Sequence, residues 1–266
     1  MKFLIVVFLA LVALTTAAEF SEPLAAKERS ISSQIVDAIE GAKTQMPCGF
    51  PGLGVPPMAP LKIGHKDINI NAGSFELEGA IDNFKLYGLN EFDIVEMKVS
   101  TITSKITFKF HFDIIHCKTV YNMLMRTGSN MKKVMNRGGN AKLALKDLTI
   151  WGTIKYSLGL IGSNGLRLKE FKVYASLGKV VSEIEGLSNI KIINRKLNEI
   201  IEEWIMLAIN DNTDNMADIS NDFVVPIANE IIGERTLTDL IGLIGGGGNG
   251  EEGEEKEECI PPIDED

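Results

Sequence analysis

The central part of the chain alternates apolar and polar residues with a period of two. In residues 105–114 every even position from Ile106 to Ile114 is apolar and every odd position is polar. This alternation predicts a strand with one buried and one solvated face. Similar patterns predict strands at 75–86, 92–102, 143–150, 153–160 and 166–175, with a hairpin turn at 163–165. Together these strands predict a long antiparallel meander that is apolar on one face.

Two of these segments change parity partway along. The apolar residues from Phe75 to Ile81 occupy odd positions, whereas Phe84 and Leu86 occupy even ones. The slip at Asp82-Asn83 predicts a β-bulge, which bends a strand and increases its twist. The same slip recurs around Lys146-Asp147. We therefore expect a strongly bent sheet.

Apolar residues at three- and four-residue spacing predict helices at both ends of the chain. Residues 30–43 form a short amphipathic helix, and residues 216–232 form another, which Pro226 kinks or divides. A further apolar segment spans residues 236–244. Between these lies a longer helix with a broad apolar stripe, the long-helix stripe, formed by Ile193, Leu197, Ile200, Ile201, Trp204, Ile205 and Ala208.

Five of the nine prolines fall within residues 46–61, a segment that we call the strap. Each proline removes a backbone donor and fixes φ, so the strap is an extended connector and not a helix or central strand. The predicted order is therefore a short helix, the strap, bent strands and long helices. Because a sheet with one apolar face must cover a core, this order predicts an α+β fold in which a highly curved antiparallel sheet is rolled around a long C-terminal helix.

Three segments divide the chain. Residues 1–18 combine a basic start, an apolar stretch and small residues at a cleavage site, which predicts a signal peptide. Residues 19–244 then form a single domain, and the glycine-rich, acidic residues 245–266 form a disordered tail. No later stretch is long and apolar enough to span a bilayer. We expect a secreted, extracellular protein with no integral membrane contact.

The formal net charge of −9 is concentrated at one end. Residues 251–266 hold nine acidic residues against Lys256, and together these contribute −8. The rest of the chain is close to neutral. This argues against nucleic-acid binding, which requires a basic face, and against strong attraction to anionic lipid surfaces.

The three cysteines are Cys48, Cys117 and Cys259. In an oxidising compartment an odd number indicates one disulfide and one leftover thiol. The sequence leaves the connectivity open. We expect Cys48 in the strap to pair with Cys117 at the end of a strong strand, and Cys259 in the acidic tail to stay free.

Residues for catalysis or metal binding are scarce. Only His65, His111 and His116 are present, and no two cysteines or histidines have the spacing of zinc ligands. The sequence 162–165 lacks the spacing of a nucleophile elbow, and the glycines at 245–248 lack the Gly-Lys-Ser/Thr of a phosphate loop. We expect no enzyme activity, cofactor or metal.

A sheet curved around a helix leaves a slot lined by apolar side chains, which is how proteins hold small hydrophobic molecules. Each such residue taken singly is more readily explained as packed core. Methionines between 123 and 135 could give the slot a deformable wall. The candidate residues for lining a ligand cavity are Phe108, Phe110, Phe112, Ile200, Ile201 and Trp204.

Several motifs carry a family resemblance over residues 30–244. The strap has the form G-x-P-x-L-G-V-P-P-x-x-P-L, and further matches occur at 87–89, 193–194 and 231–241. In this order they resemble the insect takeout and haemolymph juvenile-hormone-binding proteins, relatives of the mite group-seven allergens. The resemblance implies a tubular lipid-binding fold. It is incomplete, because takeout-type members usually carry a pair of closely spaced cysteines in the N-terminal helix, and this chain has none before Cys48.

The leading hypothesis is a secreted, non-enzymatic carrier of a small hydrophobic ligand, such as a terpenoid hormone, a fatty acid or a similar lipid. Because the chain departs from the family's cysteine pattern, the resemblance does not identify juvenile hormone itself as the ligand. The alternative is an interaction protein of the same fold that acts through its surface on a cell-surface or protein partner or on a microbial lipid. An exposed apolar patch without ligand uptake would favour the alternative.

Overall fold

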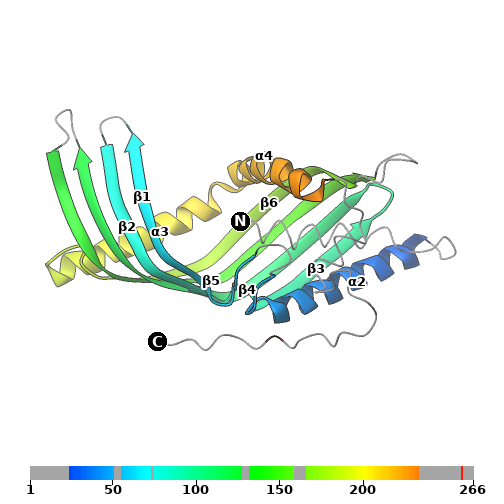
Figure 1. The fold of residues 1–266 in the computed structure, drawn as a ribbon, viewed down its shortest axis with the longest axis horizontal. Helices are drawn as coiled ribbons and strands as arrows, with labels where there is room; N and C mark the ends of the chain where they lie inside the picture. Colours follow the sequence, from blue (N-terminus) through cyan, green and yellow to red (C-terminus); the bar gives the residue numbers. More distant parts are fainter. Residues whose placement is uncertain are drawn as a thin grey trace.

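The structure is a computed structural model that describes residues 24–50, 55–72, 75–127, 132–158, 166–233 and 259. Within these residues, a six-stranded antiparallel sheet is bordered by three helices (Figure 1). In chain order the elements are α2 (Leu24–Gln45), β1 (Leu61–Ala72), β2 (Phe75–Tyr87), β3 (Phe92–Ser100), β4 (Lys105–Thr127), β5 (Lys132–Leu158), β6 (Leu166–Ile184), α3 (Lys191–Asn210) and α4 (Thr213–Ile232).

The strands pair in the order β1-β2-β4-β5-β6, and β3 pairs with β4. The very long β4 has room for two partners along one edge. Its first part pairs with β3 through residues 105–112, and its second part pairs with β2 through residues 116–127. The predicted strands at 143–150 and 153–160 belong to the single strand β5. The α+β class with a strongly curved antiparallel sheet is confirmed.

The sheet bends along a line that crosses β4, β5 and β6. Two rows of paired residues, three positions apart, both face the core: Phe112, Leu148 and Leu177, and then Ile115, Leu145 and Val180. Asp147 lies between the rows with φ 54°, and a Cβ on the neighbouring Gly178 would come within 2.8 Å of the Asp147 side chain. The predicted parity change at Lys146-Asp147 is therefore confirmed, as a bend shared by three strands whose register continues across it. The predicted bulge on β2 is confirmed at Asp82–Lys85, where Asn83 has φ 52°.

The bend separates two halves that we name by how their inner face is covered. The packed half comprises β3 and the parts of β4, β5 and β6 that pair on its side of the bend, with α2 and α4 against it. The open half comprises β1, β2 and the parts of β4 and β5 beyond the bend. Figure 1 shows β1 and β2 rising at one end of the molecule while α2 and α4 lie toward the other.

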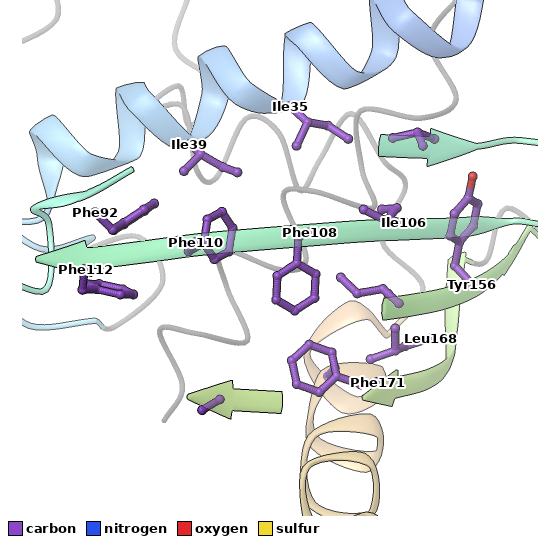
Figure 2. Close-up of a cluster of buried hydrophobic side chains, with 14 of the residues drawn as sticks. Ile35, Ile39, Phe92, Ile106, Phe108, Phe110, Phe112, Tyr156, Leu168 and Phe171 are labelled. Carbon is purple, nitrogen blue, oxygen red and sulfur yellow. The ribbon is translucent and has the colours of Figure 1, made fainter. Parts of the chain in front are cut away.

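The core fills the packed half. Phe108 is completely buried, and its ring stacks on Phe110 at 5.4 Å and on Phe171 at 6.5 Å between ring centroids. Figure 2 shows α2 contributing Ile35 and Ile39 to the cluster that these rings form. A smaller cluster joins the end of α2 to the strap and consists of Ala42, Met46, Phe50, Val55 and Met58.

Polar side chains from the helices cover the backbone groups of the edge strand β6. Asn198 accepts from the Ile184 amide and donates to the Ile184 carbonyl, at 2.8 and 3.0 Å. Asn210 makes the same two bonds to Leu177, and Asn229 of α4 makes them to Leu168. These amides replace a neighbouring strand, so the edge cannot pair with another chain.

The β3 edge is covered in the same way by α2. Ser32 accepts from the Val99 amide at 3.2 Å, and the Lys43 ammonium donates to the Phe92 carbonyl at 2.7 Å. This helix is longer than the predicted 30–43. Among the described residues, no helix is long and apolar enough to cross a membrane.

The predicted disulfide is wrong. Cys48 is bonded to Cys259, with the two Cα atoms 5.9 Å apart, and Cys117 is the free thiol. Cys117 lies inside β4, paired with Leu86 and Leu143. The glycine-rich, acidic pattern before Cys259 gives no sign that a disulfide tethers this end of the chain to the strap. The leader 1–18, the turn 163–165, the segment 236–244 and the tail apart from Cys259 lie outside the described residues.

Candidate functional site

The inner face of the open half is apolar but only half-buried. The Tyr121–Gly139 pair lies on the same face as the Cys117–Leu143 pair, four residues farther along each strand, and Leu143 packs on the core. Continuing outward on that face are six residues that we call the open-face residues: Ile68, Leu77, Ile81, Met123, Met125 and Met135. All six are half-buried, and none belongs to either core cluster of the described residues.

The outer face of the same half is polar. Arg126 is paired there with Glu76 at 3.0 Å and with Glu78 at 2.8 Å. Alternation on these strands therefore puts Glu76, Glu78 and Arg126 outside and most apolar side chains inside. Two cationic residues also lie on the inner face, Arg137 opposite Met123 and Lys66 opposite Ile81. No helix of the described residues packs over these inner residues, so they form an apolar surface on the inside of the curved sheet.

The helix α3 lies on the inner side of the β6 edge. Ser182, on the same face as Leu143, donates its hydroxyl to the Asn198 side chain at 2.8 Å. The next polar side chain along the helix, Glu202, accepts from the Ser182 amide at 2.7 Å. These contacts use the polar side of α3, and much of its apolar side stays exposed.

The predicted cavity residues fall into two separate groups. Phe108, Phe110 and Phe112 lie together in the core of the packed half (Figure 2). Trp204 and Ile200 of α3 are 68% and 59% exposed, Ile201 is half-buried, and none of the three belongs to a core cluster of the described residues. The expectation that the sheet encloses the long-helix stripe holds only for Ile205, which packs against the core.

The pattern analysis missed most of the open-face residues. The alternation predicts that Leu77 and Ile81 lie in a strand but gives them no ligand role, and it predicts only a deformable wall from the methionines. The available signal was the parity change at Asp82-Asn83, because it determines which residues of β2 face inward beyond the bulge.

Cys117 and Tyr121 both lie on this inner face. Burial raises the pKa of the Cys117 thiol, which keeps it protonated and uncharged. Burial likewise raises the pKa of Tyr121, although the nearby Arg137 opposes this, and the Tyr121 hydroxyl donates to the Glu185 carbonyl at 2.7 Å. Arg137 donates to the Leu187 carbonyl at 3.1 Å. Tyr121 and Arg137 therefore place polar groups beside the apolar surface, which suits a ligand with a polar terminus.

The histidines lie elsewhere. His65 contacts Asp82 and Asp67 on exposed positions of β1 and β2, at 2.6 and 3.2 Å. His116 stacks on Tyr87 with ring centroids 4.8 Å apart, and His111 contacts Thr149 at 3.2 Å. The residues that the structure describes contain no group of three or more histidine, cysteine or carboxylate side chains that could hold a metal ion.

The fold and its inner face define the class first: α+β proteins in which a strongly curved antiparallel sheet presents an apolar inner face beside a long helix. A family model described as haemolymph juvenile hormone binding protein matches residues 3–242, which is most of the chain. The chain therefore belongs to this family, as the strap and the later motifs predicted. A comparison with curated proteins finds no significant match.

Three solved structures are similar. Takeout 1 of Epiphyas postvittana is 18% identical with a TM-score of 0.46, over 75% of this chain and 87% of that chain. A lipopolysaccharide binding protein is 8% identical with a TM-score of 0.33, over 74% of this chain and 39% of that one. Mmm1 is 9% identical with a TM-score of 0.21, over 68% of this chain and 71% of that one. None reaches a TM-score of 0.5, so these likenesses carry no further conclusion.

Proposed function

We propose that the protein is a secreted, non-enzymatic carrier that binds a small hydrophobic ligand on the inner face of the open half. Family membership supports hydrophobic-ligand binding, because the family's description names a juvenile hormone as what its members bind. The observation that supports this location is the set of open-face residues, which are apolar and half-buried and lie on the inside of a curved sheet. The Cys48–Cys259 disulfide supports an oxidising, extracellular setting. We keep residues 1–18 as the signal peptide and residues 19–244 as one domain in this proposal.

Affinity would come from removing apolar surface from water, which contributes about 0.8 kcal/mol for each buried CH₂ group before the entropic cost of binding. Methionine side chains are flexible and adapt to ligands of irregular shape. Met123, Met125 and Met135 line neighbouring strands, so this wall suits a terpenoid, a fatty acid or a similar lipid. The exposed part of the long-helix stripe would form the second wall.

The experiment compares two single charge insertions in the mature, full-length protein. Met123→Asp places a carboxylate on the proposed wall, and Ile102→Asp places one in the exposed turn between β3 and β4, where Ile102 is 76% exposed. Displacement of a fluorescent fatty acid is measured. We expect Met123→Asp to weaken binding about tenfold or more, which corresponds to about 1.4 kcal/mol, and Ile102→Asp to leave it unchanged. Equal affinities in both variants would refute the location.

The alternative is an interaction protein that works through its surface. It is favoured by one specific observation, the exposure of Trp204, Ile200 and Leu207 on α3. Organic-solvent extraction of the native protein, followed by mass spectrometry, separates the two functions. A bound lipid supports the carrier, whereas an empty protein that takes up no fatty acid, terpenoid or sterol supports the alternative.

A further inference from the structure

Arg137 is a half-buried cation on the inner face of the open half. It pairs directly with Met123 of the neighbouring strand β4, so both side chains point to the same face. The Arg137 Nε–H donates to the Leu187 carbonyl at 3.1 Å, and an Nη1–H donates to the Asn136 carbonyl at 3.0 Å. Within the described residues these bonds use two of the five N–H donors of the guanidinium, and both acceptors are uncharged.

The segment that holds the guanidinium is itself fixed in place. The Tyr121 hydroxyl donates to the Glu185 carbonyl at 2.7 Å, and the Glu185 amide donates to the Asn140 carbonyl at 2.9 Å. Two residues farther on, Leu187 is buried and presents its carbonyl to Arg137. The position of Arg137 is therefore set before a ligand arrives, which reduces the entropic cost of binding.

The acidic side chains of the open half lie on its other face. On the described parts of β1, β2, β4 and β5 in this half, every carboxylate points outward; these residues are Asp67, Glu76, Glu78 and Asp82. They contact His65 and Arg126 there. The carboxylate of Glu185 accepts from the side chain of Asn140 at 3.0 Å, and Asn140 also points outward. The inner face therefore combines an apolar wall with positive charge.

We infer that the ligand of the proposed carrier is a hydrophobic acid, whose carboxylate binds Arg137 while its hydrocarbon chain lies along the open-face residues. This inference rests on the proposed function and narrows its ligand class. A planar guanidinium binds a carboxylate through two parallel N–H···O bonds, and such charge-assisted bonds are about twice as strong as neutral ones. A neutral ester, alcohol or hydrocarbon of the same length offers no charge to Arg137, so the site should discriminate against it.

Lys66 also lies on the inner face, on the edge strand β1 opposite Ile81, and its side chain is exposed. Three strand spacings of about 4.8 Å separate β1 from β5, so the backbones of Lys66 and Arg137 are about 14 Å apart along the sheet. The Arg137 guanidinium points away from β1, toward Leu187 beyond the end of β6. One carboxylate therefore binds one of the two cations, and Arg137 is the anchor because it is half-buried and already oriented.

A comparison of an acid with its ester tests this inference. The mature full-length protein is loaded with the uncharged dye N-phenyl-1-naphthylamine, and lauric acid or methyl laurate displaces the dye at neutral pH, where the acid is ionised. The ester carries one additional methyl group, so an apolar wall alone would bind the ester more tightly than the acid. We expect the wild type to bind laurate about tenfold more tightly than methyl laurate, which reverses that order.

Arg137→Gln removes the charge, so the affinity for laurate should fall about tenfold or more while the affinity for methyl laurate stays unchanged. Arg137→Lys keeps the charge without the planar fork and should keep only part of the preference for the acid. Arg126→Gln is the matched control, because Arg126 is a half-buried arginine on the outer face of the same half. Both this control and Lys66→Gln should keep the wild-type preference.

Binding of methyl laurate shows that a variant is folded with its apolar wall intact, so a lost preference for the acid reports on the head group alone. Equal preference in the wild type and Arg137→Gln, or tighter binding of the ester by the wild type, would overturn the inference and leave the carrier function standing. If Arg137→Gln does not bind the ester, Arg137→Lys decides, and an undiminished preference in it overturns the inference. Loss of the preference in Lys66→Gln and not in Arg137→Gln would assign the carboxylate to Lys66 and refute the role of Arg137. If the wild type binds neither compound, the inference and the carrier function both fail.

Discussion

The two halves of the sheet use the same strands in different ways. On β4, Phe108, Phe110 and Phe112 face inward in the packed half and are buried. Met123 and Met125 face inward on the same strand in the open half and are only half-buried. Apolar and polar residues alternate in the same way in both halves, so the alternation does not determine whether an inward-facing side chain is fully buried. What differs is whether a helix covers the inner face, as α2 and α4 do in the packed half.

The largest effect that tests this comparison is the loss of a buried ring. Phe108→Ala removes a completely buried side chain that contacts Phe110 and Phe171, and we expect it to lower the free energy of unfolding by about 3–5 kcal/mol. Urea denaturation followed by circular dichroism measures the change.

Met123→Ala on the same strand is the matched substitution in the open half. The free energy of unfolding should fall by less than about 1 kcal/mol, because Met123 is half-buried and belongs to no core cluster of the described residues. If both variants lose the same stability, the open half is as tightly packed as the other, and the distinction between them fails.

The next effect concerns the β6 edge. Asn198 is buried and serves both backbone groups of Ile184 as well as the Ser182 hydroxyl. Asn198→Ala leaves these groups without their partner, and we expect a loss of about 2–3 kcal/mol with faster hydrogen exchange at the Ile184 amide. Asn122→Ala, at an exposed position of β4, serves as the control and should cost less than about 0.5 kcal/mol. An unchanged exchange rate at Ile184 would mean that α3 does not hold this edge.

The curvature, β2, β3 and the strands of the packed half could be predicted from the sequence because they depend on neighbouring residues. The alternation did not predict β1 or the parts of β4 and β5 that lie in the open half. The alternation around Phe108 and the parity changes at Asp82-Asn83 and Asp147 are visible over ten residues. The identity of the buried core on β4 followed from the same signal. These features need no knowledge of which segments meet in space.

The placement of α3 could not be predicted in this way. Its apolar stripe predicted burial against the sheet, but Asn194, Asn198 and Asn210 bond to β6 instead. Asparagines inside a helix suggest solvent exposure until an unpaired strand edge is known to lie beside them. The disulfide failed for a similar reason, because Cys259 is 211 residues from Cys48 and only the fold brings them together.

The smallest expected effect on stability concerns β1, the edge strand of the open half, which carries exposed charged side chains. The pKa of His65 is raised from its usual value of 6.5, chiefly by its hydrogen bond to Asp82 and next by its hydrogen bond to Asp67. Since the folded-state pKa lies above the unfolded one, the protonated pair stabilises the fold below about pH 6.5, and this contribution is lost as pH rises through the folded pKa. NMR titration should give a midpoint above 6.5.

Two variants test which partner controls this titration. Asp82→Asn should lower the His65 midpoint more than Asp67→Asn, because the Asp82 contact is the shorter, at 2.6 Å against 3.2 Å. The change in unfolding free energy should stay well below that of Asn198→Ala, because water and salt screen an exposed pair. A wild-type midpoint at or below 6.5 would show that the pair does not form, and β1 would then depend on its backbone pairing with β2 alone.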